Sequence, residues 1–317
     1  MKKLIGIGEA LIDFIPGQKG KSIKQVEEFK PAVGGAPANV CGAFTKLGGS
    51  SAMITQLGQD PFGDKIVDEF MSYGIGCDYI SRTTCANTSL AFVALQENGN
   101  REFSFYRKPG ADMLLEADML QKEWFDDVYA LHFCSVSLGD FPIKVAHERA
   151  IEYTYASQGI ISFDPNLRFP LWENLDDLKN AVLEFLPKAD VVKVSDEEIE
   201  FITGESEIEK ALPKLMVGQV KLVIYTKGGD GAMAFTKNVS ASVDGQNLVA
   251  VDTTGAGDGF IGSFLYQLFL DEVSRDGLDY LTCEDLTRYL DFSNRFCAIS
   301  VSRKGAIASY VDYDEVR

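Results

Sequence analysis

Histidine is scarce in this sequence, which has only His132 and His147 among its 317 residues. That scarcity argues against hydrolysis by a Ser-His-Asp triad and against histidine-rich metal sites. The six cysteines are scattered without a C-x-x-C pair, so their spacing suggests neither a disulfide framework nor a zinc site. Any chemistry is therefore expected to rest on carboxylates, backbone amides and basic residues.

Positive charge and long apolar runs are also lacking. The net charge of −17 repels polyanions, so this protein is not expected to bind nucleic acid. A local set of hydrogen-bond donors could still bind a nucleotide. No apolar run reaches the roughly 18 residues that a membrane helix needs. Glu9 and Asp13 interrupt the apolar start, which therefore does not read as a signal peptide. We expect a soluble, cytoplasmic protein without a membrane partner.

Short apolar runs alternate with amphipathic stretches along most of the chain. The expected buried strands are 3–7, 52–57, 130–133, 159–163, 191–194 and 222–226. The expected helices are 63–73, 144–158, 175–186, 196–203, 208–217 and the apolar run 259–270. This alternation predicts a largely parallel α/β sheet with helices on both faces.

Two segments depart from that rhythm. Residues 13–33 are polar and weakly patterned, and the strand-like runs 89–95 and 102–107 flank the sequence ENGN at 97–100, a strong hairpin signal. We interpret them as a small β-element projecting from the α/β body.

The strongest local motif is DTTGAGDGF at 252–260, which leads into the apolar helix. Small residues allow close backbone approach to a ligand, and a helix start offers unpaired N–H groups and a favourable dipole. Such a place suits a phosphoryl group whose charge grows during transfer, and Asp258 could accept a proton from an attacking hydroxyl. A plain helix-capping aspartate after a glycine turn is the structural alternative.

A second glycine-rich motif accompanies it. The sequence GGAPAN at 34–39 and the sequence GQDPFG at 58–63 lie near the other end of the chain. Together with 252–260 they resemble the two signatures of the PfkB (ribokinase-like) family of carbohydrate kinases. Segments 105–115 (FYRKPGADMLL), 163–172 (FDPNLRFPLW) and 193–201 (KVSDEEIEF) most resemble the fructokinases of that family.

This resemblance implies a fold and an activity. The fold would be a ribokinase-like three-layer α/β/α sandwich with a small β-sheet lid, one kinase domain over 1–317 with lid segments at about 13–33 and 88–110. The activity would be ATP-dependent phosphorylation of a sugar's primary hydroxyl, fructose giving fructose 6-phosphate. ATP, Mg²⁺ and a monovalent cation such as K⁺ would take part, and two copies would dimerise through the lid. A 2-keto-3-deoxygluconate kinase and a non-catalytic sugar- or nucleotide-sensing relative stay open as alternatives.

The resemblance also implies roles for single residues. Asp258 would be the base, and the backbone amides of Gly255, Ala256 and Gly257 would form the anion hole. The sugar hydroxyls would be held by Asp13, Gly34, Gly35 and Asn39, with Arg107 and Arg168 near the sugar and the transferring phosphate. The nucleotide side would involve Ser195, Glu198, Thr226, Gly228 and Gly231, with Glu198 positioning Mg²⁺ largely through water. The monovalent cation would be bound at Asp252, Thr254, Ser300, Arg303, Gly305 and Ser309, partly through backbone carbonyls.

One detail departs from the family pattern, and two motifs typical of other nucleotide-binding folds are excluded. Many relatives have Asn-x-x-Glu where this chain has SDEE at 195–198, which weakens the role of Ser195 more than that of Glu198. The sequence GKS at 20–22 is not the end of a P-loop, because position 15 is isoleucine and no strand–loop–helix context surrounds it. Gly6 and Gly8 hint at a dinucleotide fold, but the third glycine is replaced by Leu11.

Overall fold

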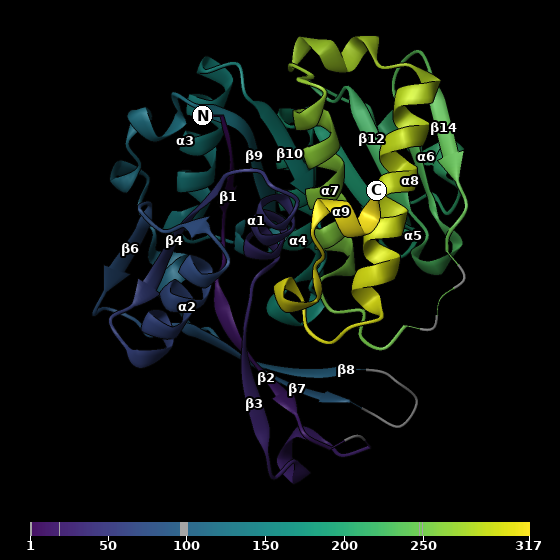
Figure 1. The fold of residues 1–317 in the computed structure, drawn as a ribbon. Helices are drawn as coiled ribbons and strands as arrows, with labels where there is room; N and C mark the ends of the chain where they lie inside the picture. The colour runs from purple at the N-terminus through teal and green to yellow at the C-terminus, as the bar shows by residue number, and fades with distance from the viewer. Residues whose placement is uncertain (1, 19, 96–100, 247, 249) are drawn as a thin grey trace.

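A sheet of ten strands forms the centre of the protein (Figure 1). The computed structural model describes residues 2–18, 20–95, 101–246, 248 and 250–317. The strand order is β14 (Ser240–Val243), β13 (Ala232–Phe235), β12 (Leu222–Thr226), β11 (Val191–Ser195), β10 (Ile160–Asp164), β9 (Val128–Cys134), β1 (Lys3–Ile7), β4 (Ser51–Gly58) and β5 (Ile75–Gly76), and β6 (Ile80–Thr83) pairs with β4. The pairs from β12 across to β5 and β6 are parallel, whereas β13 and β14 are antiparallel additions.

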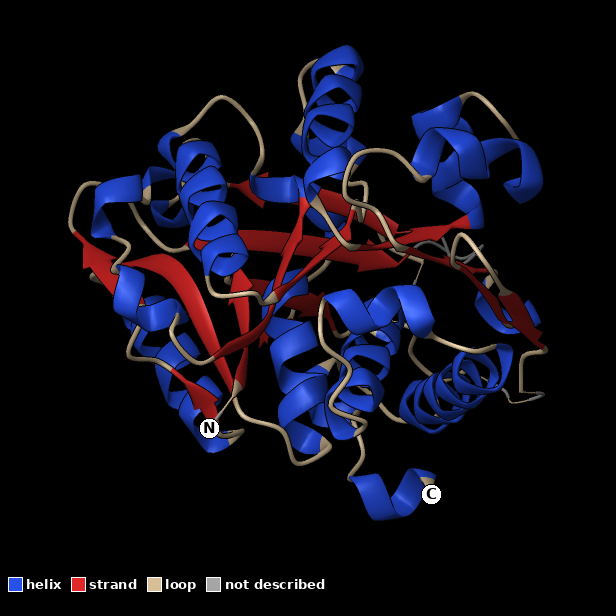
Figure 2. Ribbon diagram, turned by 90° about the horizontal axis from the view of Figure 1, so that it is seen from above, coloured by secondary structure: helices blue, strands red, loops and turns tan. Residues whose placement is uncertain are grey.

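Helices cover both faces of this sheet (Figure 2). Successive strand residues point to opposite faces, so Leu4 and Val191 enter one hydrophobic cluster while Ile5 and Val192 enter the other. The first cluster is completed by α1 (Ala36–Lys46), α2 (Pro61–Ser72), α7 (Ala256–Leu270), α8 (Cys283–Val301) and α9 (Tyr313–Val316). The second is completed by α3 (Pro142–Ala156), α4 (Leu175–Phe185), α5 (Asp196–Thr203) and α6 (Ile208–Leu215). The expected three-layer α/β/α arrangement is confirmed.

The expected elements agree closely with the structure. The strands at 3–7 and 222–226 and the helix at 196–203 have the expected ends, and the other expected elements are displaced by a few residues at most. The expected helices and strands did not include α1, α8, α9, β5, β6 or the hairpin of β13 and β14. A signal for α8 was present, because Thr282 and Asp285 form a capping box in which the Thr282 amide and hydroxyl donate to Asp285 Oδ2 at 3.0 and 2.6 Å.

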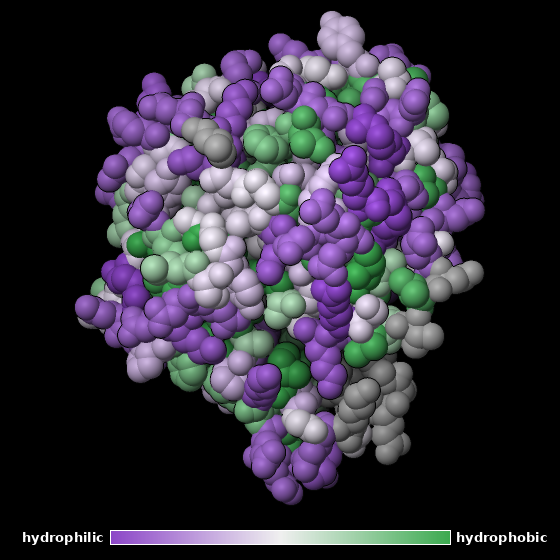
Figure 3. All heavy atoms as spheres, viewed as in Figure 1, coloured by the Kyte–Doolittle hydropathy of each residue, from purple (hydrophilic) through white to green (hydrophobic). Residues whose placement is uncertain are grey.

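A four-stranded sheet projects from the body, at the bottom of Figure 1, in the order β3 (Phe29–Gly34), β2 (Leu11–Pro16), β7 (Ser89–Leu95) and β8 (Arg101–Tyr106). The antiparallel pairing of β7 with β8 confirms the two arms of the expected hairpin, while its turn at 97–100 lies outside the described residues. Phe14 stacks on Phe92 with ring centroids 4.5 Å apart. In Figure 3, hydrophilic residues cover most of the visible face and hydrophobic ones show where the small sheet meets the body.

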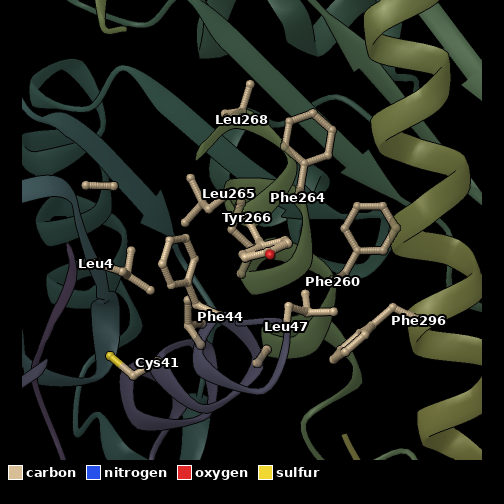
Figure 4. Packing of buried hydrophobic residues seen from close by; sticks show 14 of the residues in the cluster. Leu4, Cys41, Phe44, Leu47, Phe260, Phe264, Leu265, Tyr266, Leu268 and Phe296 are labelled. Carbon is tan, nitrogen blue, oxygen red and sulfur yellow. The ribbon is translucent and has the colours of Figure 1, made fainter. Parts of the chain in front are cut away.

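Helix α7 is buried along almost its whole length between α1 and α8 (Figure 4). Phe44 from α1 and Phe296 from α8 belong to the same hydrophobic cluster as the α7 residues Phe260 and Phe264. A Cβ at Gly262 would lie 2.7 Å from Ala43 Cβ, so only glycine allows this approach of the two helices. The close contact brings the first turn of α7 beside the first turn of α1.

No helix in the described part of the chain is long and apolar enough to cross a membrane.

Candidate active site

Asp258 lies in the first turn of α7 and is only 7% exposed. Its Oδ2 accepts a hydrogen bond from Asn39 Nδ2 at 2.8 Å, and its Oδ1 accepts one from Asn166 Nδ2 at 3.2 Å. Asn39 belongs to the first turn of α1, and Asn166 follows β10 with a φ of 44°. The motifs at 34–39 and 252–260, which are far apart in the sequence, therefore meet through a direct contact.

The surroundings of Asp258 make its carboxylate a stronger base than usual. Burial raises the pKa of Asp258, the hydrogen bond from Asn39 lowers it, and the neighbouring carboxylate of Asp164 raises it. Arg168 and Lys193 lower the pKa in turn, without cancelling the effect of burial. A carboxylate with a raised pKa, held in place by two amides, is suited to accept a proton from a hydroxyl group.

The turn that precedes Asp258 depends on Gly255, whose φ is 74°. A Cβ there would lie 2.8 Å from both Ala306 Cβ and Tyr310 Oη, so the position suits glycine alone. The Tyr310 hydroxyl donates to the Gly255 carbonyl at 2.7 Å and braces the turn. The Ala256 amide donates to Thr253 O at 3.2 Å, whereas Gly257 lies in the first helical turn, where N–H groups have no intrahelical partner.

A buried ion pair beside this turn was not anticipated. Lys193, in β11, is 5% exposed, and its Nζ donates to Asp164 Oδ2 at 2.8 Å. The same Nζ lies 3.1 Å from the place where a Cβ on Gly257 would stand. Asp164 Oδ1 accepts from the Asn166 backbone amide at 3.1 Å. The available signal was a lysine within an otherwise apolar strand, since charged residues are rarely buried unless they are paired.

Glu198 connects two segments at the edge of the site. Its Oε2 accepts from the Ser195 backbone amide at 2.9 Å, and its Oε1 accepts from the Leu167 amide at 2.8 Å. Glu198 therefore fastens the start of α5 to the loop after β10. Each carboxylate oxygen retains a further lone pair for water, a donor set that fits Mg²⁺ held through water.

The expected sugar-binding residues gather where the small sheet meets α1. Asp13 and Gly34 lie on the paired strands β2 and β3, and a Cβ on Gly34 would collide with the Asp13 carboxylate. Gly35 has a φ of 120°, and a Cβ there would collide with the Glu9 carbonyl. Asn39 Oδ1 is buried and has no hydrogen-bond partner among the described residues, so it can accept a bond from a ligand hydroxyl.

The two arginines differ in their surroundings. Arg107 is buried, and its Nε donates to Asp112 Oδ2 at 2.9 Å while its guanidinium also reaches Ser137 Oγ at 3.2 Å. It lines a cleft of about 900 Å³ between the small sheet and the body, and Asp258 is not among the described residues lining that cleft. Arg168 is exposed, its Nη1 donates to the Leu167 carbonyl at 3.1 Å, and it lowers the pKa of Asp258.

The residues expected on the nucleotide side lie at a tight turn after β12, which ends at Thr226. Gly228 and Gly231 have φ angles of 53° and 101°, and a Cβ at Gly231 would collide with the Val243 carbonyl. Both glycines are therefore needed to connect β12 to β13.

The expected cation-binding residues lie before α7, in the last turn of α8 and in the segment that follows α8. Asp252 accepts from the Thr254 amide and hydroxyl at 3.0 and 2.6 Å, and from the Gly305 amide at 3.0 Å. The hydroxyls of Ser300 and Ser309 donate to the carbonyls of Phe296 and Ala306. The Arg303 side chain pairs with Glu315 at 2.6 Å, so a role of Arg303 in cation binding would rest on its backbone carbonyl. Carboxylate, hydroxyl and carbonyl oxygens are hard donors that suit K⁺.

Comparison with known proteins places these features in a family. The family described as pfkB family carbohydrate kinase matches residues 1–312. Fructokinase-2 of Oryza sativa subsp. japonica is 41% identical over 305 residues, 96% of this chain and 89% of that protein. The fructokinase of Xylella fastidiosa with bound ATP superposes with a TM-score of 0.91 and 32% identity, covering 99% of this chain and 96% of that one. The fructokinase of Vibrio cholerae O395 in its fructose, ADP and calcium ion bound form gives a TM-score of 0.87 and 32% identity, covering 100% and 98%.

Proposed function

The chain belongs to the pfkB family of carbohydrate kinases and has the ribokinase-like fold, and from this we propose that it transfers a phosphoryl group from ATP to fructose, giving fructose 6-phosphate. The observation that carries the proposal is the buried Asp258 carboxylate, held by Asn39 and Asn166 at the start of a buried helix.

Asp258 would act as the general base. It would accept the proton of the sugar's primary hydroxyl while the oxygen attacks the terminal phosphorus of ATP in line with the leaving group. The negative charge on the transferring group would be stabilised by backbone amides at the start of α7, with Gly257 foremost because the Ala256 amide already donates to Thr253. Mg²⁺ would neutralise phosphate charge, with Glu198 orienting its water ligands.

Residues around the base would orient the acceptor. Asn39 Oδ1 and the Asp13 carboxylate are placed to accept hydrogen bonds from sugar hydroxyls, and the glycines at 34 and 35 leave room for the ring to approach the backbone. Arg168 would help to hold the transferring phosphate. A monovalent cation beside Asp252 and Thr254 would stabilise the loop that leads into the turn at Gly255.

The alternatives fit less well. A 2-keto-3-deoxygluconate acceptor needs positive charge for its carboxylate, but Arg107 is already neutralised by Asp112 and Arg168 is assigned to the transferring phosphate. A non-catalytic relative would have lost the base or the anion hole, and Gly255 to Asp258 are all present. Fructose is therefore the acceptor that we propose.

The small sheet would serve as a lid and as a dimer contact. Its outer strands β3 and β8 present backbone groups that a second copy could extend, which supports a homodimer. Closing the lid over the sugar would exclude water from the terminal phosphate of ATP.

The six cysteines are present as free thiols, which fits the reducing cytoplasm.

A coupled ADP-release assay tests the proposed function. Purified protein with Mg²⁺ and ATP would be compared on fructose, 2-keto-3-deoxygluconate, ribose and adenosine, each over a range of concentrations. We expect the highest kcat/KM with fructose. Faster turnover of the keto acid would assign the protein to that acceptor, and binding of fructose without ADP release would support the non-catalytic relative.

A further inference from the structure

The ion pair of Lys193 and Asp164 lies at the inner end of the site, close to the base. The two residues lie on neighbouring parallel strands, β11 and β10, and their side chains are 7% and 1% exposed. Lys193 Nζ lies beside Gly257, the residue directly before Asp258. Asp164 is connected to Asp258 through Asn166, whose backbone amide bonds to Asp164 and whose side chain bonds to Asp258.

From this geometry we propose that Lys193 and Asp164 are positioning residues with opposite effects on Asp258, and that their pairing keeps the base ionised where the enzyme works. The inference rests on the proposed role of Asp258 as the base. Lys193 supplies a fixed positive charge that favours the Asp258 carboxylate, whereas Asp164 supplies a negative charge that disfavours it. Because the two charges are bound to each other, neither acts on Asp258 unopposed.

Groups on every surrounding element bear on this balance. Charges come from Asp164 on β10, Arg168 after it and Lys193 on β11. Neutral titratable groups that interact with Asp258 are Cys134 on β9, Cys297 on α8 and Tyr310 near the C-terminus. Burial raises the pKa of all three, so they stay protonated and uncharged at neutral pH. The ion pair and Arg168 are thus charges that act on how readily Asp258 loses its proton.

The surroundings of Lys193 also keep it charged. The carboxylates of Asp164, Glu198 and Asp258 raise the pKa of Lys193 against the opposing effect of burial. Its loss would leave Asp164 as an unpaired negative charge next to the base. The loss of Asp164 would instead leave the ammonium group free to act on Asp258 alone.

The test is a pH profile of kcat/KM for fructose in Lys193→Met, Asp164→Asn, the double variant and Lys193→Arg. This profile reports the ionisation of the free enzyme, and activity falls where the base becomes protonated. In Lys193→Met we expect the acid limb to move to higher pH by about one unit or more, and in Asp164→Asn to lower pH by a similar amount. The double variant should return close to the wild type. The amide side chain in Asp164→Asn keeps an oxygen for the Asn166 backbone N–H.

A purely structural role predicts a different pattern. Loss of packing would lower kcat in all variants without moving the acid limbs of their pH profiles in opposite directions. That result would overturn the inference. If Lys193→Met does not fold, Asp164→Asn and the double variant still decide it, because the downward shift must appear in the first and be cancelled in the second. Lys193→Arg keeps the positive charge, so the acid limb of its pH profile should stay at the wild-type position. Failure of the proposed function would look different again, as wild-type protein without fructose-dependent ADP release.

Discussion

Replacing Asp258 by asparagine removes the proposed base with little change of shape. The new side chain would keep one oxygen to accept from either Asn39 or Asn166. Its NH₂ group would face the other amide, and Asn39 can turn its unpartnered Oδ1 toward it. The hydrogen-bonding network can therefore be completed in the variant.

The expected consequences for activity and stability have opposite signs. Loss of a general base typically lowers the rate by ~10²–10⁴-fold, and we expect kcat to fall within that range. Burial raises the pKa of Asp258, which means that the folded state disfavours the carboxylate relative to water. The neutral amide removes that unfavourable burial of charge. Asp258→Asn should therefore be at least as stable as the wild type at about pH 8.

The assay combines steady-state ADP release with calorimetric binding of fructose and thermal unfolding. Asp190→Asn is a matched control, because Asp190 is fully buried at the opposite end of β11 and its Oδ1 accepts from Arg275 Nε at 2.8 Å. Breaking that buried pair should cost about 3–5 kcal/mol of unfolding free energy and leave kcat nearly unchanged. If Asp258→Asn kept kcat within about tenfold of the wild type, Asp258 would not be the base.

Three further predictions concern the anion hole, a buried carboxyl and the lid. Gly257→Val should lower kcat by about 10²–10³-fold, because its Cβ would stand 3.1 Å from Lys193 Nζ and its branches would block the amides; an unchanged kcat would remove Gly257 from the anion hole. Burial raises the pKa of the Glu9 carboxyl above its ordinary value of 4.5, so the folded state binds the Glu9 proton more tightly than the unfolded chain does. The free energy of unfolding therefore falls as pH rises from the ordinary pKa to the raised pKa of Glu9. Urea unfolding should consequently show Glu9→Gln gaining stability relative to the wild type between about pH 5 and pH 8, and a constant difference would contradict the raised pKa. ATP hydrolysis without sugar should be far slower than fructose phosphorylation, whereas equal ADP release with and without fructose would exclude a gating lid.

The α/β body was predictable because its signals are local. Each central strand is a short apolar run and each covering helix has one apolar face, so periodicity alone located most of them. The expected elements did not include α1, the short elements β5, β6, β13, β14 and α9, or α8, whose capping signal was overlooked. The hairpin arms of the small sheet were also predictable, from the turn residues between them.

The partners of the site residues were harder to foresee. Asn166 was visible only as part of a turn after a strand, yet it donates to Asp258 across 92 positions. Arg107 was expected near the sugar and the phosphate, and the structure adds that Asp112 neutralises it in a buried pair. Glu198 was expected near Mg²⁺, and it also accepts from two backbone amides. The residue types gave no indication of these contacts.

The sequence by itself determined the family, the alternation of strands and helices, and the glycine turn at 255, because these depend on neighbouring residues and on which conformations they allow. Only the tertiary structure decided that Asn39 contacts Asp258 across 219 positions and that Lys193 pairs with Asp164 across 29. The physical reason is that a buried charge is stabilised by whichever group the packing of distant elements brings within a few ångströms. Strand order and helix packing set that distance, and no local pattern encodes it.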